Sequence, residues 1–203
     1  MNDTKTIQHI LNIINQTLCG AGDSDQLSAA IFGIATTTRG KQFLELGTRS
    51  GCTTIPLLLS AKILGAKLTS IDIQYPLFSC PQDLMENWNF VKTDAIKFLE
   101  TTKEHYDLIF VDDWHDGFHV KKELDLIAPL CSKSTIVLLH DLMYGWKNPE
   151  YNTCNNGAEC GCGAPSEFDN GGPYWAVSSM DSDTWEFSTI PFCNGLTILR
   201  RKK

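Results

Sequence analysis

Short apolar runs alternate with helical stretches along most of the chain, and this alternation predicts a parallel sheet flanked by helices. We expect five parallel strands, each bounded by turn residues, over 42–46, 67–73, 89–92, 106–112 and 134–140. Two later runs, 185–190 and 196–200, flank the segment 191–195 and predict a closing antiparallel hairpin. The expected fold class is therefore α/β, with a mostly parallel sheet and helices on both faces.

Helical periodicity marks most of the segments outside these strands. Before the first strand, one apolar stripe recurs at helical spacing over 6–18 and predicts an amphipathic surface helix: Ile7, Ile10, Leu11, Ile14 and Leu18. A second helix should begin near Asp23 and end before Gly40. Further helices are expected over 53–64, 94–99, 120–130 and 174–180. The two N-terminal helices either cover a bound ligand or pack against the edge of the sheet.

A length of 203 residues fits a single domain with a sizeable core. We divide it into N-terminal helices at 1–40, a ligand-binding core at 41–144, an insertion at 145–183 and the C-terminal hairpin at 184–203. The insertion is rich in Gly, Asn, Pro, Ser and Cys, and loops of this length are usually functional or mobile. We expect the insertion to lie over the substrate pocket and to set substrate choice.

The formal net charge of −7 argues against a surface that binds nucleic acid, because such surfaces cluster Lys and Arg. The basic residues at 200–203 are more typical of a solubilising tail than of a binding arm. No apolar run approaches the roughly 20 residues that span a bilayer, and the N-terminus lacks signal-peptide features. We therefore expect a cytoplasmic protein that binds neither nucleic acid nor membrane.

The eight cysteines fall into two groups. Four lie in segments that look buried, where we expect reduced thiols: Cys19, Cys52, Cys80 and Cys131. Three others, which with Cys193 offer four thiolates for zinc, lie in the insertion: Cys154, Cys160 and Cys162. Their spacing lacks the Cys-x-x-Cys pairs of common structural zinc sites, so a loop disulfide or free thiols is the favoured interpretation.

The segment 43–54 has the pattern of a strand, a tight glycine turn and the start of a helix. Gly47 and Gly51 allow the backbone to turn sharply and to approach a ligand closely. The turn lacks the Gly-x-Gly-x-x-Gly spacing that presents amides to a pyrophosphate, and the chain lacks the Gly-Lys-Ser/Thr of an NTPase. A cationic ligand without phosphate is a better electrostatic match for Glu45 at the end of the strand.

An acidic residue stands at or just after the end of each expected parallel strand: Glu45, Asp72, Asp94, Asp112 and Asp141. Ligands of open α/β sheets bind beyond the carboxyl ends of the strands, so these acids are candidates for one shared site. Asp72 is placed to accept both hydroxyls of a ribose, and Asp94 and Ala95 to lie near an adenine edge. For Asp94, capping of the following helix is an equal alternative.

Three stretches resemble the class I S-adenosylmethionine (SAM)-dependent methyltransferases. The first is the acidic residue followed by Gly-x-x-x-Gly at 45–51. The second, 106–124 with Asp-Asp-Trp-His-Asp at 112–116, resembles the fourth-strand signature of catechol-type and bacterial family-24-type O-methyltransferases. The third comprises Ser-Thr-Ile-Val-Leu-Leu-His-Asp at 134–141 and the hairpin turn at 191–196. The resemblance implies the Rossmann-like class I methyltransferase sheet.

By this resemblance, the protein uses SAM to methylate a hydroxyl of a small molecule, and residues 41–144 are the SAM-binding core. His115 and Asp112 are the implied catalytic residues. Asp112 and Asp141 are the implied ligands of a divalent ion such as Mg²⁺, with His140 as a candidate third ligand. The implied cofactor-binding residues follow the same motifs: Glu45, Gly47, Thr48, Ser50, Gly51, Thr53, Asp72, Ile73, Asp94, Ala95, Asp112 and Trp114.

Two positions depart from the catechol-type pattern. His115 replaces the catalytic Lys, and the unperturbed pKa of a histidine suits a base at neutral pH. Leu142 replaces an Asn ligand, so the metal site lacks one donor unless His140, His115 or Asp113 supplies it. These changes leave open a SAM-binding protein without catalysis. A nucleotide-binding oxidoreductase or hydroxylase-like relative on the same fold is a further alternative.

The remaining expectations concern neighbouring side chains and assembly. Trp114 either lies against the adenine or anchors the following helix in the core, and His115 is either a base or a solvent-facing loop residue. His105 and His119 are expected to be surface residues. By analogy with other small methyltransferases, a homodimer is a candidate assembly.

Overall fold

A seven-stranded sheet with strand order β3-β2-β1-β4-β5-β7-β6 forms the centre of the computed structural model, which describes residues 4–19, 23–143 and 171–202. The five strands β3, β2, β1, β4 and β5 run parallel to one another. Strands β7 and β6 close the sheet as an antiparallel hairpin. The strands are β1 (Gln42–Leu46), β2 (Lys67–Asp72), β3 (Trp88–Lys92), β4 (Tyr106–Val111), β5 (Cys131–Leu139), β6 (Trp185–Ile190) and β7 (Leu196–Arg201).

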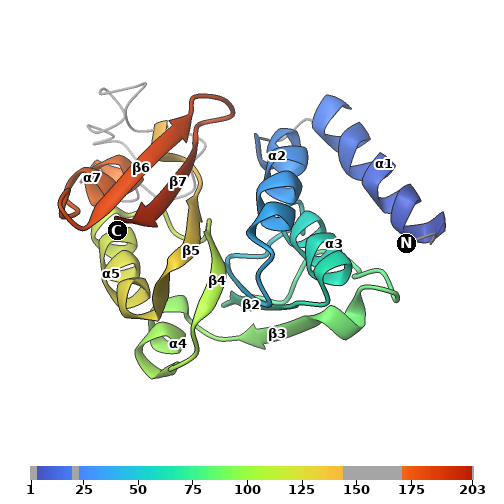
Figure 1. The fold of residues 1–203 in the computed structure, drawn as a ribbon, viewed down its shortest axis with the longest axis horizontal. Coiled ribbons are helices and arrows are strands. Elements are labelled where there is room, and N and C mark those ends of the chain that lie inside the picture. Colours follow the sequence, from blue (N-terminus) through green and yellow to red (C-terminus); the bar gives the residue numbers. More distant parts are fainter. Residues whose placement is uncertain (1–3, 20–22, 144–170, 203) are drawn as a thin grey trace.

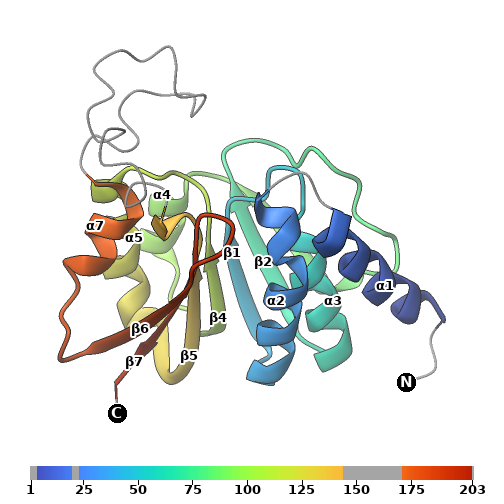
Figure 2. The same cartoon turned by 90° about the horizontal axis from the view of Figure 1, so that it is seen from above.

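Helices cover both faces of the sheet, as Figures 1 and 2 show. One face carries α1 (Thr4–Cys19), α2 (Asp23–Thr38) and α3 (Thr54–Leu64); the other carries α4 (Ala95–Thr101), α5 (Gly117–Ile127) and α7 (Gly172–Ser178). Short 3₁₀ turns at Met85–Asn87 and Ala128–Leu130 precede β3 and β5. Each face has its own apolar core, because side chains along a strand point alternately to opposite faces.

Strand β4 illustrates this alternation. Leu108 and Phe110 are fully buried against the α2 and α3 side, whereas Ile109 and Val111 are buried against the α5 side. A strand buried on both faces reads as a continuous apolar run, which is why its position is evident in the sequence.

The pairing register brings the strand ends to one edge. Leu46 pairs with Ile71 on one side and with Val111 on the other, and Val111 pairs with Leu139. The residues that follow these four therefore meet along the carboxyl edge of the sheet, which is where the sequence places its acidic residues.

Several predicted boundaries shift by a few residues. Strand β5 begins at Cys131, three residues before the expected start, and β2 ends at Asp72, which leaves Ile73 outside the strand. Helix α5 begins at Gly117 because Asp116 caps it, accepting from the His119 N–H at 2.8 Å. The predicted helix over 174–180 is α7, which begins two residues earlier.

Helix α1 forms as predicted, and Ile10 of its expected apolar stripe packs against the core, but three other residues of the stripe do not. Ile13 is buried against α2 and α3, whereas Ile7, Leu11 and Ile14 are each more than 40% exposed. The helix lies on other helices and not on the sheet edge, so a narrower face suffices to bury it (Figure 2). Among the described residues, no helix combines the length and apolarity needed to cross a membrane.

Cys52, Cys80, Cys131 and Cys193 are thiols and not disulfides in this structure. The three insertion cysteines, Cys154, Cys160 and Cys162, lie outside the described residues, as does most of the predicted 145–183 insertion.

Candidate active site

The turn between β1 and α3 requires both of its glycines. Gly47 has φ of +89° and Gly51 has φ of +81°, in the region that side chains disfavour. A Cβ at Gly47 would lie 2.3 Å from the carbonyl oxygen of Asp112, and one at Gly51 would lie 2.5 Å from the ring of Phe78. The first glycine therefore allows the ends of β1 and β4 to approach each other.

Glu45 points into the protein and not toward the edge. Its side chain is fully buried and accepts hydrogen bonds from the hydroxyls of Thr53 at 2.8 Å, Thr54 at 2.9 Å and Ser70 at 2.6 Å. Burial raises its pKa to about 7, against the lowering effect of these hydroxyls. Glu45 and Thr53, both expected to contact a cofactor, instead bind one another and tie β1 to the start of α3.

Asp72 holds the glycine turn in place. Its Oδ2 accepts from the backbone N–H and the hydroxyl of Thr48, each at 3.0 Å, and from the N–H of Arg49 at 3.2 Å. Its Oδ1 accepts from the N–H of Gln74 at 2.8 Å. Burial works to raise the pKa of Asp72, but these hydrogen bonds outweigh it and lower the pKa. A ribose hydroxyl would have to share or replace one of these donors.

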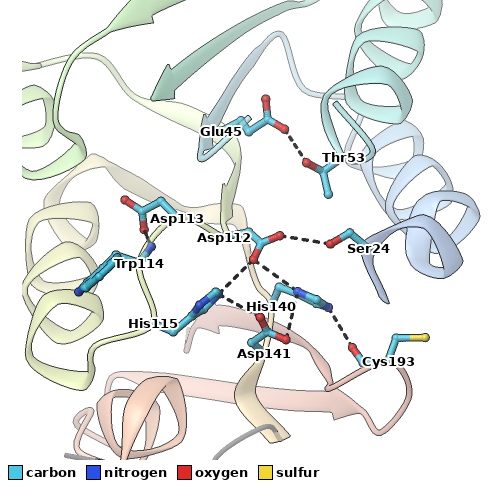
Figure 3. A network of polar contacts seen from close by, with 10 residues as sticks. All are labelled: Ser24, Glu45, Thr53, Asp112, Asp113, Trp114, His115, His140, Asp141 and Cys193. Carbon is cyan, nitrogen blue, oxygen red and sulfur yellow. Dashed lines mark hydrogen bonds and ion pairs between the residues drawn. The ribbon is translucent and has the colours of Figure 1, made fainter. Parts of the chain in front are cut away.

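Two acids and two histidines meet where β4 and β5 end (Figure 3). Nε2 of His115 lies 3.0 Å from Oδ2 of Asp141 and 3.4 Å from Oδ1 of Asp112. Nδ1 of His140 lies 3.4 Å from Oδ1 of each of the same two acids. Ser24 on α2 reaches Asp112 from the opposite side, with 3.5 Å between its hydroxyl and Oδ2. We name Asp112, His115, His140 and Asp141 the edge cluster.

Attraction between the acids and the histidines shifts pKa values within this edge cluster. Burial alone would raise the pKa of Asp112, but His140 and His115 hold it well below its usual range. Burial likewise works to lower the pKa of His140, yet Asp112 and Asp141 raise that pKa to about 9. The edge cluster therefore pairs the charged carboxylate of Asp112 with the cationic imidazole of His140.

The far side of His140 contacts the C-terminal hairpin. Its Nε2 lies 2.9 Å from the carbonyl oxygen of Cys193, which can only accept, so this nitrogen carries the proton. Nδ1 of His140 and Oδ1 of Asp141 are buried and have no hydrogen-bond partner. Asp141 also has φ of +61°, a conformation that is uncommon outside glycine but tolerated by Asp.

Nδ1 of His140 and Oδ1 of Asp141, which lack hydrogen-bond partners among the described residues, bear on whether a metal ion fits in the edge cluster. Asp112, His115 and Asp141 each offer a ligand atom within 4.8 Å of the others, and Nδ1 of His140 faces the same two carboxylates. The donor set suits a divalent ion. Leu142 is buried and offers no ligand.

Two large apolar side chains are exposed at the same edge. Ile73, just beyond β2, is 64% exposed and Trp114, beyond β4, is 40% exposed. Trp114 is therefore not a core anchor, and Figure 3 shows it pointing away from the edge cluster. Exposed apolar surface beside polar strand ends is typical of a ligand site.

The other predicted cofactor residues lie apart from the edge cluster. Ser50 is exposed in the glycine turn, where its hydroxyl contacts the Cys52 thiol at 3.1 Å. Asp94 caps α4, accepting from the Lys97 N–H at 3.0 Å, and Ala95 is buried in the core. For Asp94 the structure thus shows capping of the following helix, which was the expected alternative to an adenine contact.

Four residues at or near the site were not predicted from the sequence. Ser24 and the carbonyl of Cys193 reach the edge cluster from distant parts of the chain, which no local pattern reveals. His119, expected to be a surface residue, is partly buried between Asp113 and the fully buried Glu123. The spacing of four residues between His119 and Glu123 on a predicted helix was the available signal.

Comparison with known proteins places this geometry in context. Residues 44–142 match the model of a family described as a methyltransferase domain. The structure is similar to the SAH-bound methyltransferase PaMTH1 from Podospora anserina, with 15% identity and a TM-score of 0.64 over 99% of this chain and 89% of that one. No curated protein matches the sequence.

Two further solved structures are similar over 100% of this chain. The O-methyltransferase from Bacillus cereus in complex with SAH has 12% identity and a TM-score of 0.60, with 93% of its chain covered. The O-methyltransferase TomG from Streptomyces achromogenes, involved in tomaymycin synthesis and bound to SAM, has 12% identity and a TM-score of 0.59, with 92% covered. These likenesses confirm the expected fold, a class I methyltransferase sheet.

Proposed function

We propose that this protein transfers a methyl group from SAM to a hydroxyl of a small molecule, a proposal that the match of residues 44–142 to a methyltransferase-domain model supports. The observation that carries the proposal is the edge cluster, which joins His115 to two carboxylates at the carboxyl edge of the sheet. Relatives of this fold have been solved with SAH or SAM bound, which supports the cofactor.

The cofactor site in this proposal lies between the glycine turn and the exposed apolar residues. SAM supplies the methyl group when it is bound. Gly47 keeps the backbone close to Asp112, Asp72 fixes the turn, and Ile73 and Trp114 offer apolar surface for a flat ring. Glu45 and Thr53 act indirectly, by holding β1 against α3.

His115 is the residue that we assign to hold the proton of the acceptor hydroxyl. Nε2 of His115 lies 3.0 Å from Oδ2 of Asp141 and 3.4 Å from Oδ1 of Asp112, so both carboxylates stabilise the imidazolium that forms when the acceptor's proton passes to the other ring nitrogen, Nδ1. His115 is partly exposed, which leaves it accessible to an acceptor from outside. Asp112 and Asp141 thus orient the His115 ring and also stabilise its positive charge.

Asp112, Asp141 and His140 would hold a divalent ion at the same place. When bound, such an ion supplies Lewis-acid polarisation of a coordinated hydroxyl. Nδ1 of His140 would have to be deprotonated to serve as a ligand, because its Nε2 already donates to Cys193.

The first experiment is calorimetric titration with SAM, with and without Mg²⁺, followed by methyl-transfer assays on a panel of hydroxylated acceptors. We expect SAM binding in the wild type and a loss of rate of roughly 10²–10⁴-fold in His115→Gln, the usual contribution of a general base. His105→Gln is the matched control, because His105 lies immediately before β4, away from the edge cluster, with its Nδ1 3.2 Å from the Leu130 carbonyl oxygen.

Each outcome separates the alternatives. Absence of SAM binding would contradict the proposal and leave only the fold. SAM binding without transfer to any acceptor would favour a non-catalytic SAM-binding protein, an alternative that Leu142 in place of an expected Asn supports. A Mg²⁺ effect that disappears in Asp141→Asn would assign the ion to the edge cluster.

A further inference from the structure

A second group of side chains that could bind a metal ion lies between α5 and the loop that follows β4. Asp113 comes from this loop, and His119 and Glu123 come from successive turns of α5. Nε2 of His119 lies 3.4 Å from Oδ2 of Asp113 and 3.4 Å from Oε1 of Glu123. The three ligand atoms all lie within 4.8 Å of one another. We name Asp113, His119 and Glu123 the α5 cluster.

Glu123 is the anomalous member of the α5 cluster. Its side chain is fully buried, yet neither of its oxygens has a hydrogen-bond partner, and Nε2 of His119 has none either. A buried carboxylate without partners is costly, and most buried polar groups in native proteins are satisfied. For Glu123, the partner among the described residues is Nε2 of His119 at 3.4 Å, beyond hydrogen-bond distance, so a bound cation would pair its oxygens more closely.

The distances fit a shared ion better than direct hydrogen bonds. At 3.4 Å, both contacts of His119 exceed the usual 2.7–3.2 Å of an N–H···O hydrogen bond. Ligands bound tetrahedrally to Zn²⁺ at 2.0–2.1 Å are separated from each other by about 3.3–3.4 Å. Both separations in the α5 cluster match that spacing.

The electrostatics are those of a site that protons fill when no ion is present. Burial, with the neighbouring Asp113 charge, raises the pKa of Glu123 to about 8. Burial works to lower the pKa of His119, but Asp113 and Glu123 raise it to about 10. Ion binding would replace these protons, since ligands must be deprotonated.

We propose that Asp113, His119 and Glu123 bind one divalent transition-metal ion of the Zn²⁺ type, separate from the edge cluster. One imidazole and two carboxylates leave a fourth position for water, and imidazole favours Zn²⁺ or Co²⁺ over Mg²⁺. Asp113 can bind the ion through Oδ2 while its Oδ1 accepts from the Trp114 N–H at 2.6 Å. The ion would fasten the loop 112–116 to α5. This inference does not rest on the proposed methyl transfer.

The test is a titration of metal-free full-length protein with Co²⁺, followed by visible absorption. The chain contains eight cysteines, and a thiolate-bound Co²⁺ adds a near-ultraviolet charge-transfer band that nitrogen and oxygen ligands do not give. All proteins carry Asp112→Asn and Asp141→Asn, so that the edge cluster does not compete. The variants are His119→Gln and Glu123→Gln, with His105→Gln as the matched control.

We expect one equivalent of Co²⁺ to bind without the thiolate band, to be displaced by Zn²⁺ and to raise the melting temperature. Removal of one ligand in His119→Gln or Glu123→Gln should weaken binding by roughly tenfold or more, and His105→Gln should not. Circular dichroism checks that each variant folds; His119 is partly exposed, so its variant remains informative if Glu123→Gln unfolds. Absence of Co²⁺ binding, a thiolate band, or equal binding by the variants would overturn the proposal.

Discussion

Glu45 is a fully buried carboxyl group whose hydrogen bonds hold β1 to its neighbours, although its place at a strand end suggested a ligand contact. Three hydroxyl groups surround it, from Thr53, Thr54 and Ser70, and none of its surface is exposed. Because burial raises its pKa from 4.5 to about 7, the folded protein binds a proton that the unfolded chain releases between these values.

The Glu45 contribution to stability therefore decreases as pH rises. It is fully present below pH 4.5 and is lost by about pH 7, with a size of about 3 kcal/mol at ~1.4 kcal/mol per pKa unit. Glu45→Gln removes the ionisation, so the free energy of unfolding of the variant relative to wild type should rise across this interval. Denaturant unfolding at pH 5, 6, 7 and 8 measures it.

Glu86→Gln is the control for this titration, because Glu86 is exposed at the other end of the sheet. Its stability should follow that of the wild type at each pH. Parallel pH profiles for Glu45→Gln and wild type would show that Glu45 is ionised at all these values.

At the scale of elements, variants of Asp94 can distinguish capping of α4 from binding of a cofactor. Its Oδ1 accepts from the Lys97 N–H at the first turn of α4. Asp94→Ala should destabilise the protein by about 1 kcal/mol, or roughly 2–4 °C in melting temperature, whereas Asp94→Asn retains most of the cap. SAM titration of the same variants decides between roles: weaker binding in a folded Asp94→Asn would support the cofactor contact.

The elements that the sequence predicts best are those whose pattern is set by burial on both sides. Strands β1, β2 and β4 are apolar runs between turn residues, and their ends differ from prediction by at most one residue. The packed face of α1 was not predictable, because apolar residues lie on two of its faces and only contact with α2 and α3 decides which is buried. Periodicity alone does not identify the packing partner.

The candidate site was predictable in part for a related reason. Acids at strand ends identify the carboxyl edge, and the parallel register brings Asp112 and Asp141 together there. The direction of each side chain was not predictable: Glu45 points inward and Asp72 binds the turn, because hydroxyl and amide donors lie next to them in the fold. Contacts from Ser24 and Cys193 depend on the whole tertiary structure.

At the scale of the whole molecule, α1 carries an apolar surface that stays exposed among the residues that the structure describes. Ile7, Leu11 and Ile14 lie on one face of this helix and are 55%, 53% and 44% exposed. Exposed apolar stripes on soluble proteins commonly mark interaction surfaces. We expect a second copy of the chain to cover this stripe, in line with the homodimer that analogy with other small methyltransferases suggests.

Light scattering coupled to size exclusion tests the dimer. Ile7→Gln with Leu11→Gln should shift a dimeric wild type to the monomer, while Gln8→Ala on the same helix should not. Glutamine keeps helix propensity high, so a change of mass reports the lost apolar contact and not unfolding of α1. A monomeric wild type would contradict the expectation and leave the stripe for another partner.

The hydrogen bond between His140 and the carbonyl of Cys193 also has a consequence for biosynthesis. Translation runs from the N-terminus to the C-terminus, so Cys193 emerges from the ribosome after all five parallel strands. A nascent chain that has already formed β1 to β5 still lacks the acceptor that orients His140. The hydrogen bond that orients His140 can therefore form only late in synthesis, after β1 to β6 have left the ribosome.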